Sequence, residues 1–229
     1  TSGNDRISGG TGRDFLAGGR GDDFLDGGAG ADMLDGGDSN DEMIGGPNDV
    51  TDGNDLIDGG AGVDTITSGW GGPTAANYAA DATTLGDILR GGDGNDAIDG
   101  SASGAAFIYG DAGDDLLRAG SGPGQVLGGT GNDTIYGGAN AAGRTAALYG
   151  DDGDDEMHGT AFADAIYGGR GADRIFAYGG ADAVDVGTGA ADGSGGDALD
   201  LGSGAGDPAA AGGAGGGFAS QGGDGLDLG

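Results

Sequence analysis

The chain has 229 residues, 63 of them glycine, and its 39 acidic residues outnumber 8 basic ones to give a formal net charge of −31. This composition is outside the range of ordinary globular domains and by itself favours disorder. The basic residues are all arginine and are scattered, cysteine is absent, and no apolar run approaches the roughly 20 residues of a membrane span. Nucleic acid is therefore not an expected partner, and disulfides and thiolate metal sites are excluded.

A nine-residue period organises the chain from the third residue to residue 185. The unit is G-G-x-G-x-D-x-U-x, where U is aliphatic, as in the consecutive segments "GGRGDDFLD" and "GGAGADMLD" and later in "GGDGNDAID" and "GGTGNDTIY". Eighteen units can be laid along the chain, with U at Ile7, Leu16, Leu25, Leu34, Met43, Ile57, Ile66, Leu89, Ile98, Ile108, Leu117, Val126, Ile135, Leu148, Met157, Ile166, Ile175 and Val184. Because every U residue is aliphatic or methionine, we expect an ordered repeat when its ligand is bound.

This repeat resembles the RTX nonapeptide family over about four-fifths of the chain. The resemblance implies an all-β fold, a right-handed parallel β-roll in which x-U-x is a short strand, G-G-x-G-x-D is a turn, and two units form a coil of 18 residues. It also implies multiple Ca²⁺ ions between consecutive turns of one edge, held by backbone carbonyls and aspartate carboxylates. Family members are exported and include toxins, proteases, lipases, adhesins and surface-layer proteins. We therefore expect a secreted, extracellular or cell-surface protein.

The residue types support calcium independently of the resemblance. Glycine at the first, second and fourth positions allows positive φ and lets carbonyls approach one another. Oxygen ligands without sulfur or imidazole favour calcium over transition metals. A core one aliphatic residue wide cannot offset the backbone entropy and the charge repulsion, so we predict that folding is coupled to calcium binding.

The turn aspartates separate into two rows, one along each edge of the predicted roll. Alternate units give an unbroken first row of Asp5, Asp23, Asp41, Asp64, Asp96, Asp115, Asp133, Asp155 and Asp173. The second row consists of Asp14, Asp32, Asp55, Asp87, Asp164 and Asp182, with Ala106, Gly124 and Ala146 in the three intervening units. These fifteen aspartates, together with Asp197, are the predicted metal ligands. At most twelve interturn sites result, eight in the first row and four in the second.

The two edges and the two faces of the roll are expected to differ. The four steps between U positions that exceed nine residues all lead into second-row turns. The strands that follow second-row turns carry outward apolar residues such as Phe15, Met33 and Ile88, whereas the other face is mixed. An exposed apolar stripe favours a contact surface. The alternative is that the insertion containing Trp70 and Tyr78 folds back to cover part of it.

No catalytic constellation is present, and we predict that the chain is not an enzyme. The chain has no H-E-x-x-H motif and no serine in a G-x-S-x-G elbow, and the single histidine, His158, is expected to be a surface residue. The glycine-rich turns precede short strands and not helices, which argues against phosphate-binding loops.

Beyond residue 185 the period loosens, which predicts an irregular Gly/Ala-rich extension over 186–229 after the β-roll of 1–185. The leading hypothesis is a non-catalytic structural or assembly module that folds on binding calcium. The alternative is a calcium-triggered secretion or folding domain of a larger toxin, protease, lipase or adhesin. An ice- or mineral-binding solenoid is weaker, because the outward positions carry no threonine ladder. Neither end carries a recognisable cap, so we also expect self-association, end to end or through the apolar face.

Overall fold

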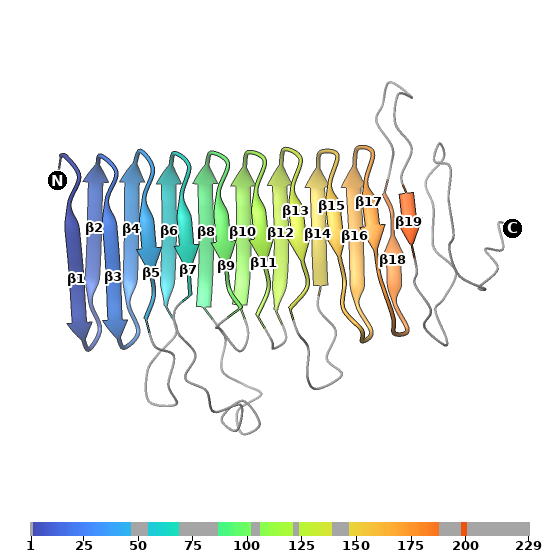
Figure 1. Cartoon of the computed structure of the whole chain (residues 1–229), viewed down its shortest axis with the longest axis horizontal. Helices are drawn as coiled ribbons and strands as arrows, with labels where there is room; N and C mark the ends of the chain where they lie inside the picture. The colour runs from blue at the N-terminus through green and yellow to red at the C-terminus, as the bar shows by residue number, and fades with distance from the viewer. Residues whose placement is uncertain are drawn as a thin grey trace, which may run out of the picture.

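The repeat folds into a solenoid of two parallel β-sheets. The computed structural model describes residues 2–46, 55–68, 87–101, 106–120, 124–138, 147–187 and 198–200. Successive strands alternate between the two sheets, so two strands and two turns make one coil (Figure 1). None of the described residues is helical, and this part of the chain therefore contains no helix that could cross a membrane. The predicted all-β parallel solenoid is confirmed.

Each sheet contains every second strand of the chain. The odd-numbered sheet contains β1 (Arg6–Thr11), β3 (Phe24–Ala29), β5 (Glu42–Ile44), β7 (Thr65–Thr67), β9 (Ala97–Asp99), β11 (Leu116–Arg118), β13 (Thr134–Tyr136), β15 (Glu156–His158), β17 (Arg174–Phe176) and β19 (Ala198–Asp200). The even-numbered sheet contains β2 (Phe15–Arg20), β4 (Met33–Asp38), β6 (Leu56–Ala61), β8 (Asp87–Asp93), β10 (Ala106–Ala112), β12 (Gln125–Thr130), β14 (Ala147–Asp152), β16 (Ala165–Arg170) and β18 (Ala183–Asp185).

Strand pairing keeps the U residues in register whatever the length of the coil. Ile7 pairs with Leu25 and Leu25 with Met43, each a step of 18 residues. Ile66 pairs with Ile98 across the longest insertion, a step of 32 residues. Because a slip of one residue would turn every aliphatic side chain outward, the core fixes the register and the insertions are confined to the turns.

The strands are longer than the expected three residues wherever the following turn is regular. Pairing in the even-numbered sheet continues into the first-row turns, for example at Gly19 and Gly37. In the odd-numbered sheet only β1 and β3 extend in this way, through Gly10 and Gly28. From β5 onward the odd-numbered strands are three residues long, because most of their second-row turns carry insertions or lack the glycine pair.

The core is a double column of U side chains between the sheets. Seventeen of the eighteen predicted U residues are buried, and Ile7, on the first coil, is partly buried against the same cluster. Leu199 of β19 joins the cluster and lies beside Ile175. The predicted core is therefore confirmed, and the odd-numbered sheet continues into the segment predicted as a C-terminal extension. The boundary at residue 185 itself stays a prediction.

The outer faces carry different side chains. On the even-numbered sheet Phe15, Met33 and Ile88 are 68%, 43% and 38% exposed. On the odd-numbered sheet the guanidinium of Arg6 lies 3.7 Å from the ring centroid of Phe24. The insertion with Trp70 and Tyr78 lies outside the described residues, so whether it covers the apolar face stays a prediction.

Candidate metal sites along the two edges

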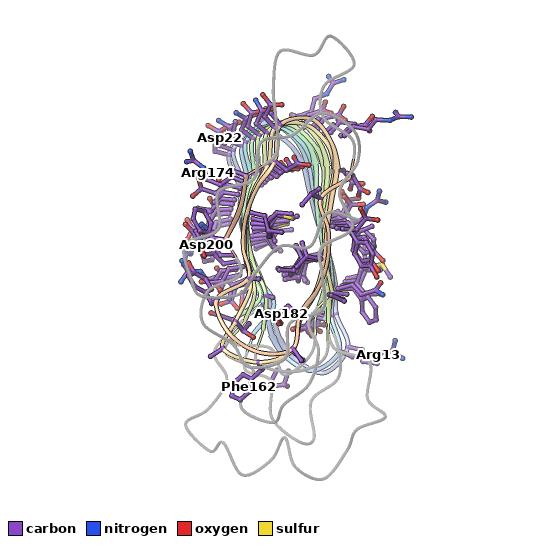
Figure 2. All side chains as sticks on the ribbon, turned by 90° about the vertical axis from the view of Figure 1, so that its right-hand side faces the viewer. Arg13, Asp22, Phe162, Arg174, Asp182 and Asp200 are labelled. Carbon is purple, nitrogen blue, oxygen red and sulfur yellow. The ribbon has the colours of Figure 1, made fainter. Side chains whose placement is uncertain are left out.

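The turn aspartates line the two narrow edges of the solenoid, in the two rows that the repeat predicts. An end-on view places the turn of Asp22 at one edge and Asp182 at the other (Figure 2). Of the fifteen predicted ligands in the described residues, thirteen are buried with 3% exposure or less, while Asp5 and Asp14 at the first coil are partly buried. The sixteenth, Asp197, lies outside the described residues.

Each aspartate is tied to the preceding coil by one carboxylate oxygen. In the first row the backbone N–H of each aspartate donates to Oδ1 of the next, from Asp5 to Asp173 without a gap, at 2.6 to 3.0 Å. In the second row the same bonds join Asp14 through Asp87 and then Asp164 to Asp182, at 2.9 to 3.0 Å. We call these bonds the inner ladder. They bring together fifteen of the predicted ligands in the predicted order.

The second carboxylate oxygen faces a gap between coils. Among the described residues, Oδ2 is buried and without a hydrogen-bond donor in Asp14, Asp23, Asp41, Asp64, Asp96, Asp115, Asp133 and Asp155. Burial raises the pKa of Asp64, Asp115 and Asp155 to about 7 and that of Asp133 to about 6, because desolvation disfavours the charged form. A buried carboxylate oxygen without a donor costs free energy on folding, so a cation beside it would stabilise the fold.

The first glycine of each turn marks a small oxygen-lined cradle. A β-carbon placed on Gly36 would lie 2.5 Å from both Asp41 Oδ2 and the carbonyl oxygen of Gly59, one coil further on. On Gly45 it would lie 2.6 Å from Asp55 Oδ2 and from the Ser68 carbonyl oxygen. These values are close to calcium–oxygen distances of about 2.3–2.6 Å. The same pair of oxygens surrounds the first glycines of twelve turns, namely Gly9, Gly18, Gly27, Gly36, Gly45, Gly59, Gly91, Gly110, Gly128, Gly150, Gly159 and Gly168.

The turn backbone brings carbonyls together at these cradles. In the eight first-row turns from Gly18 to Asp173, the second and fourth residues all have positive φ, including the non-glycine residues Ser39, Asp111 and Asp151. Within the described residues no three acidic or histidine side chains converge on one point. A cation in this place would therefore depend on backbone carbonyls as well as carboxylates, a ligand set that suits calcium better than magnesium.

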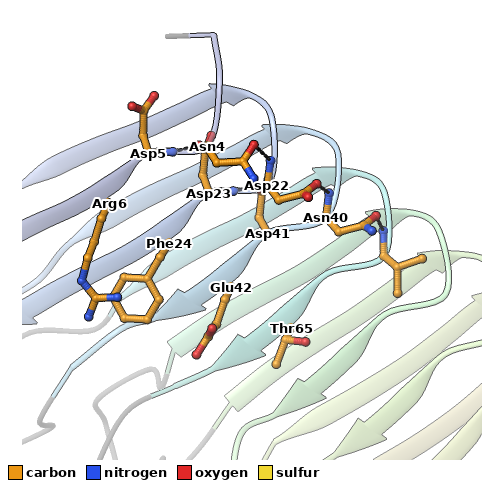
Figure 3. A pocket seen from close by; sticks show the side chains of 11 residues that line it. Asn4, Asp5, Arg6, Asp22, Asp23, Phe24, Asn40, Asp41, Glu42 and Thr65 are labelled. Carbon is orange, nitrogen blue, oxygen red and sulfur yellow. Dashed lines mark hydrogen bonds between the residues drawn. The ribbon is translucent and has the colours of Figure 1, made fainter.

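A second set of hydrogen bonds strengthens the first-row edge and was not anticipated from the sequence. The fifth turn residue is often asparagine or aspartate, and its Oδ1 accepts the backbone N–H of the equivalent residue in the following coil. Figure 3 shows this for Asn4 with Asp22 and for Asp22 with Asn40, whose donor–acceptor distances are 3.1 and 3.2 Å. Asn40 accepts the backbone N–H of Val63 in the same way, at 2.8 Å. We call these bonds the outer ladder; they resume at Asn95 and run to Ala172.

The outer ladder points opposite to the inner one. Its side chains reach forward to the next coil, whereas the inner-ladder carboxylates reach back. The signal was available in the sequence, because asparagine or aspartate precedes seven of the nine first-row aspartates. Among the six second-row aspartates only Asp55 follows such a residue, Asn54. First-row coils are therefore tied in both directions.

In some turns the first residue is not glycine and carries a side chain. Ser68 and Ala177 begin the turns of Asp87 and Asp182, and Val186 begins the next first-row turn; all three are fully buried. By analogy with the glycine turns, their β-carbons lie where the next cradle would be. The glycine argument consequently does not extend to Asp197, whose role as a ligand stays a prediction.

His158 faces outward from the odd-numbered sheet but is only 15% exposed in its side chain. Its ring lies between Tyr136 and Phe176, with centroid distances of 4.6 and 4.8 Å. The ring nitrogens lie 2.7 Å from the Tyr178 hydroxyl and 3.0 Å from Glu156. The expected surface histidine is thus largely covered by its neighbours.

We expect Gly36→Ala to cost one calcium ion and to raise the calcium concentration needed for folding, because the methyl group would take the place between Asp41 and Gly59. Gly179→Ala is the matched control: its β-carbon would meet no atom within 4 Å and its φ is not positive. Native mass spectrometry counts the ions, and circular dichroism follows folding. Equal ion counts in the two variants would contradict the cradle.

Acidification should weaken calcium binding. The raised pKa values of Asp64, Asp115 and Asp155 mean that, without a cation, these groups favour the folded state most below about pH 4. This contribution decreases above that pH and is lost as the pH rises through about 7. Calcium requires the ionised form. We therefore expect the calcium midpoint for folding to rise as the pH falls below about 7, about tenfold per unit for each proton that an ion displaces. A midpoint that is constant between about pH 8 and 5 would contradict this.

Comparison with known families agrees with the geometry. The RTX calcium-binding nonapeptide repeat, described in units of four copies, matches residues 1–34, 25–51, 35–74, 81–104, 103–126, 125–141 and 158–190. A search of curated proteins finds no match. The matched segments cover well over half of the chain, and the chain belongs to the RTX calcium-binding nonapeptide-repeat family.

Proposed function

We propose that this β-roll is a secreted, non-catalytic module that folds on binding Ca²⁺ and acts as a structural or assembly element at a cell surface or in an extracellular polymer. The observation that supports it best is the first row: seven successive buried aspartates, from Asp23 to Asp155, each face a gap lined by a carbonyl of the next coil. We propose calcium in the cradles of both rows, with the turn aspartates as ligands.

Within the part of the chain that the structure describes, no basic side chain pairs with the central aspartates of the first row. The arginine ion pairs found among the described residues lie on the surface, as between Arg20 and Asp38 or Arg90 and Asp111. None includes a residue of the Asp23 to Asp155 series. Ionised carboxylates stacked one coil apart repel one another in a site of low dielectric. Divalent cations between them would turn that repulsion into attraction.

Other features agree with a structural role. The family comparison finds only calcium-binding repeats, and no catalytic domain is identified. RTX repeats are typical of secreted proteins, which supports an extracellular location, where calcium is abundant. The two long parallel sheets and the ladders along their edges provide an extended surface (Figure 1).

Chelating calcium should unfold the chain. We expect circular dichroism to show a disordered spectrum without calcium and a β-rich one after titration, because neither the thin core nor the charge of −31 permits a roll without ions. Asp115→Ala, in the unbroken row, should raise the calcium midpoint more than Asp87→Ala, whose turn begins with Ser68. A folded state without calcium, or equal effects of the two variants, would refute the proposal.

The assembly role can be tested separately from calcium binding. We propose that copies associate through the even-numbered face, where Phe15, Met33 and Ile88 are exposed. Sedimentation at saturating calcium should show association that Phe15→Ser with Ile88→Ser weakens. A protein that stays monomeric at high concentration would refute assembly and favour the alternative role as a folding domain of a larger toxin or hydrolase.

A further inference from the structure

One second-row turn has the glycine and the aspartate that the repeat requires, but the residues between them differ from the repeat. Residues 159–164 read G-T-A-F-A-D, with Gly159 first and Asp164 last. A β-carbon on Gly159 would lie 2.8 Å from Asp164 Oδ2 and 3.0 Å from the carbonyl oxygen of Ala177, so the cradle oxygens are both present. On the repeat pattern alone, this turn should bind an ion.

The backbone of this turn follows a different path. The second and fourth positions are Thr160 and Phe162, and neither has positive φ, whereas both positions do in the eight first-row turns and in the second-row turns that begin at Gly9 and Gly27. The carbonyls of this turn are therefore not presented as they are in the regular turns.

Instead, Thr160 forms hydrogen bonds with the carboxylate of Asp164. Its backbone N–H donates to Asp164 Oδ2 at 2.6 Å, and its hydroxyl oxygen lies 2.9 Å from Oδ2 and 3.1 Å from Oδ1. The hydroxyl in turn accepts the backbone N–H of Phe162 at 3.1 Å. Asp164 is 1% exposed, so these donors act in a site with little water.

We infer that Thr160 takes the place of a calcium ion at Asp164, so that this turn is closed by hydrogen bonds and not by a cation. This inference rests on the proposed calcium binding in the other cradles. Oδ2, which faces the cradle without a donor in turns such as those of Asp14 and Asp155, is here held by two donors of one residue. Two hydrogen bonds to a buried carboxylate offset much of its desolvation without added charge.

The competing reading is that the Thr160 hydroxyl is itself a calcium ligand. The amide of Thr160 argues against it. Its N–H points at Oδ2 from 2.6 Å, which places the positive end of a backbone dipole on the oxygen that an ion would need. The hydroxyl also donates toward the carboxylate, so its hydrogen, too, lies on the side of the ligand oxygens.

The consequence is an uneven distribution of ions. Ala106, Gly124 and Ala146 already remove the carboxylate from three second-row units. If the Asp164 turn is closed as well, second-row ions are confined to the cradles of Gly9, Gly27 and Gly45, near the N-terminal end. The remaining coils bind calcium along the first-row edge alone.

A matched pair of isosteric variants tests the inference. Asp155→Asn and Asp164→Asn each keep the side-chain shape and one acceptor oxygen, and native mass spectrometry of the full chain at saturating calcium counts bound ions. We expect Asp155→Asn to lose one ion and Asp164→Asn to keep the count of the unmodified chain. Loss of one ion in Asp164→Asn would overturn the inference. If Asp155→Asn also keeps the full count, the assignment of ions to the turn aspartates is wrong, and the inference falls with it.

Thr160→Val provides a second readout should Asp164→Asn fail to fold. Valine keeps the β-branched shape and the backbone N–H but removes the hydroxyl. We expect an unchanged ion count together with a higher calcium midpoint for folding, because Asp164 loses one donor. Loss of an ion would show that the hydroxyl binds calcium and would overturn the inference.

Discussion

The structure depends on one arrangement, a buried carboxylate placed between two coils. One of its oxygens accepts an N–H from the coil before it, and the other faces a carbonyl of the coil after it. A hydrogen bond can satisfy the first oxygen, but two oxygens that face each other need something positive between them. The glycine at the start of the turn, the positive φ values and the high net charge follow from this need. Without a positive group between the coils, so many buried ionised aspartates would be incompatible with folding.

The two edges differ in their tolerance of insertions because different hydrogen bonds join the coils at each edge. At the first-row edge the inner and outer ladders bond the N–H groups of two consecutive turn residues, as at Asn132 and Asp133. An insertion there would break bonds to both neighbouring coils. At the second-row edge only the inner ladder is present in the described turns, and it stops where the aspartates stop. The insertions are found at that edge, where a longer turn disturbs less of the coil-to-coil bonding.

Much of this could be predicted from the sequence, because the nonapeptide template fixes both the strand position and the row. Counting residues along the nonapeptide template is enough to identify the U residues, the two rows and the edge with insertions. The outer ladder was missed because the template leaves the fifth position open, although Asn4, Asn40, Asn95 and Asn132 repeat there. The role of Thr160 could not be read from the sequence at all. It depends on the φ angle of the turn, which decides whether the hydroxyl faces the carboxylate or the solvent.

Further contacts between coils lie beside the second-row edge, in two units that lack its carboxylate and in the two units that follow them. Arg118, Tyr136, His158 and Phe176 directly precede the second-row turns of four successive coils, and their planar groups stack with near-parallel rings from Tyr136 to Phe176. Each stacked pair of rings is worth about 0.5–1.5 kcal/mol and depends on no calcium ion. Along its length, the solenoid therefore replaces aspartate cradles at the second-row edge by ring stacking between coils. On the proposed assignment of ions, the N-terminal coils bind cations at both edges, whereas the later coils combine first-row cations with stacked rings and the Thr160 hydroxyl at the second-row edge. Loss of calcium would then remove all coil-to-coil bridging by ions at the N-terminal end but leave part of the second-row bonding intact in the later coils.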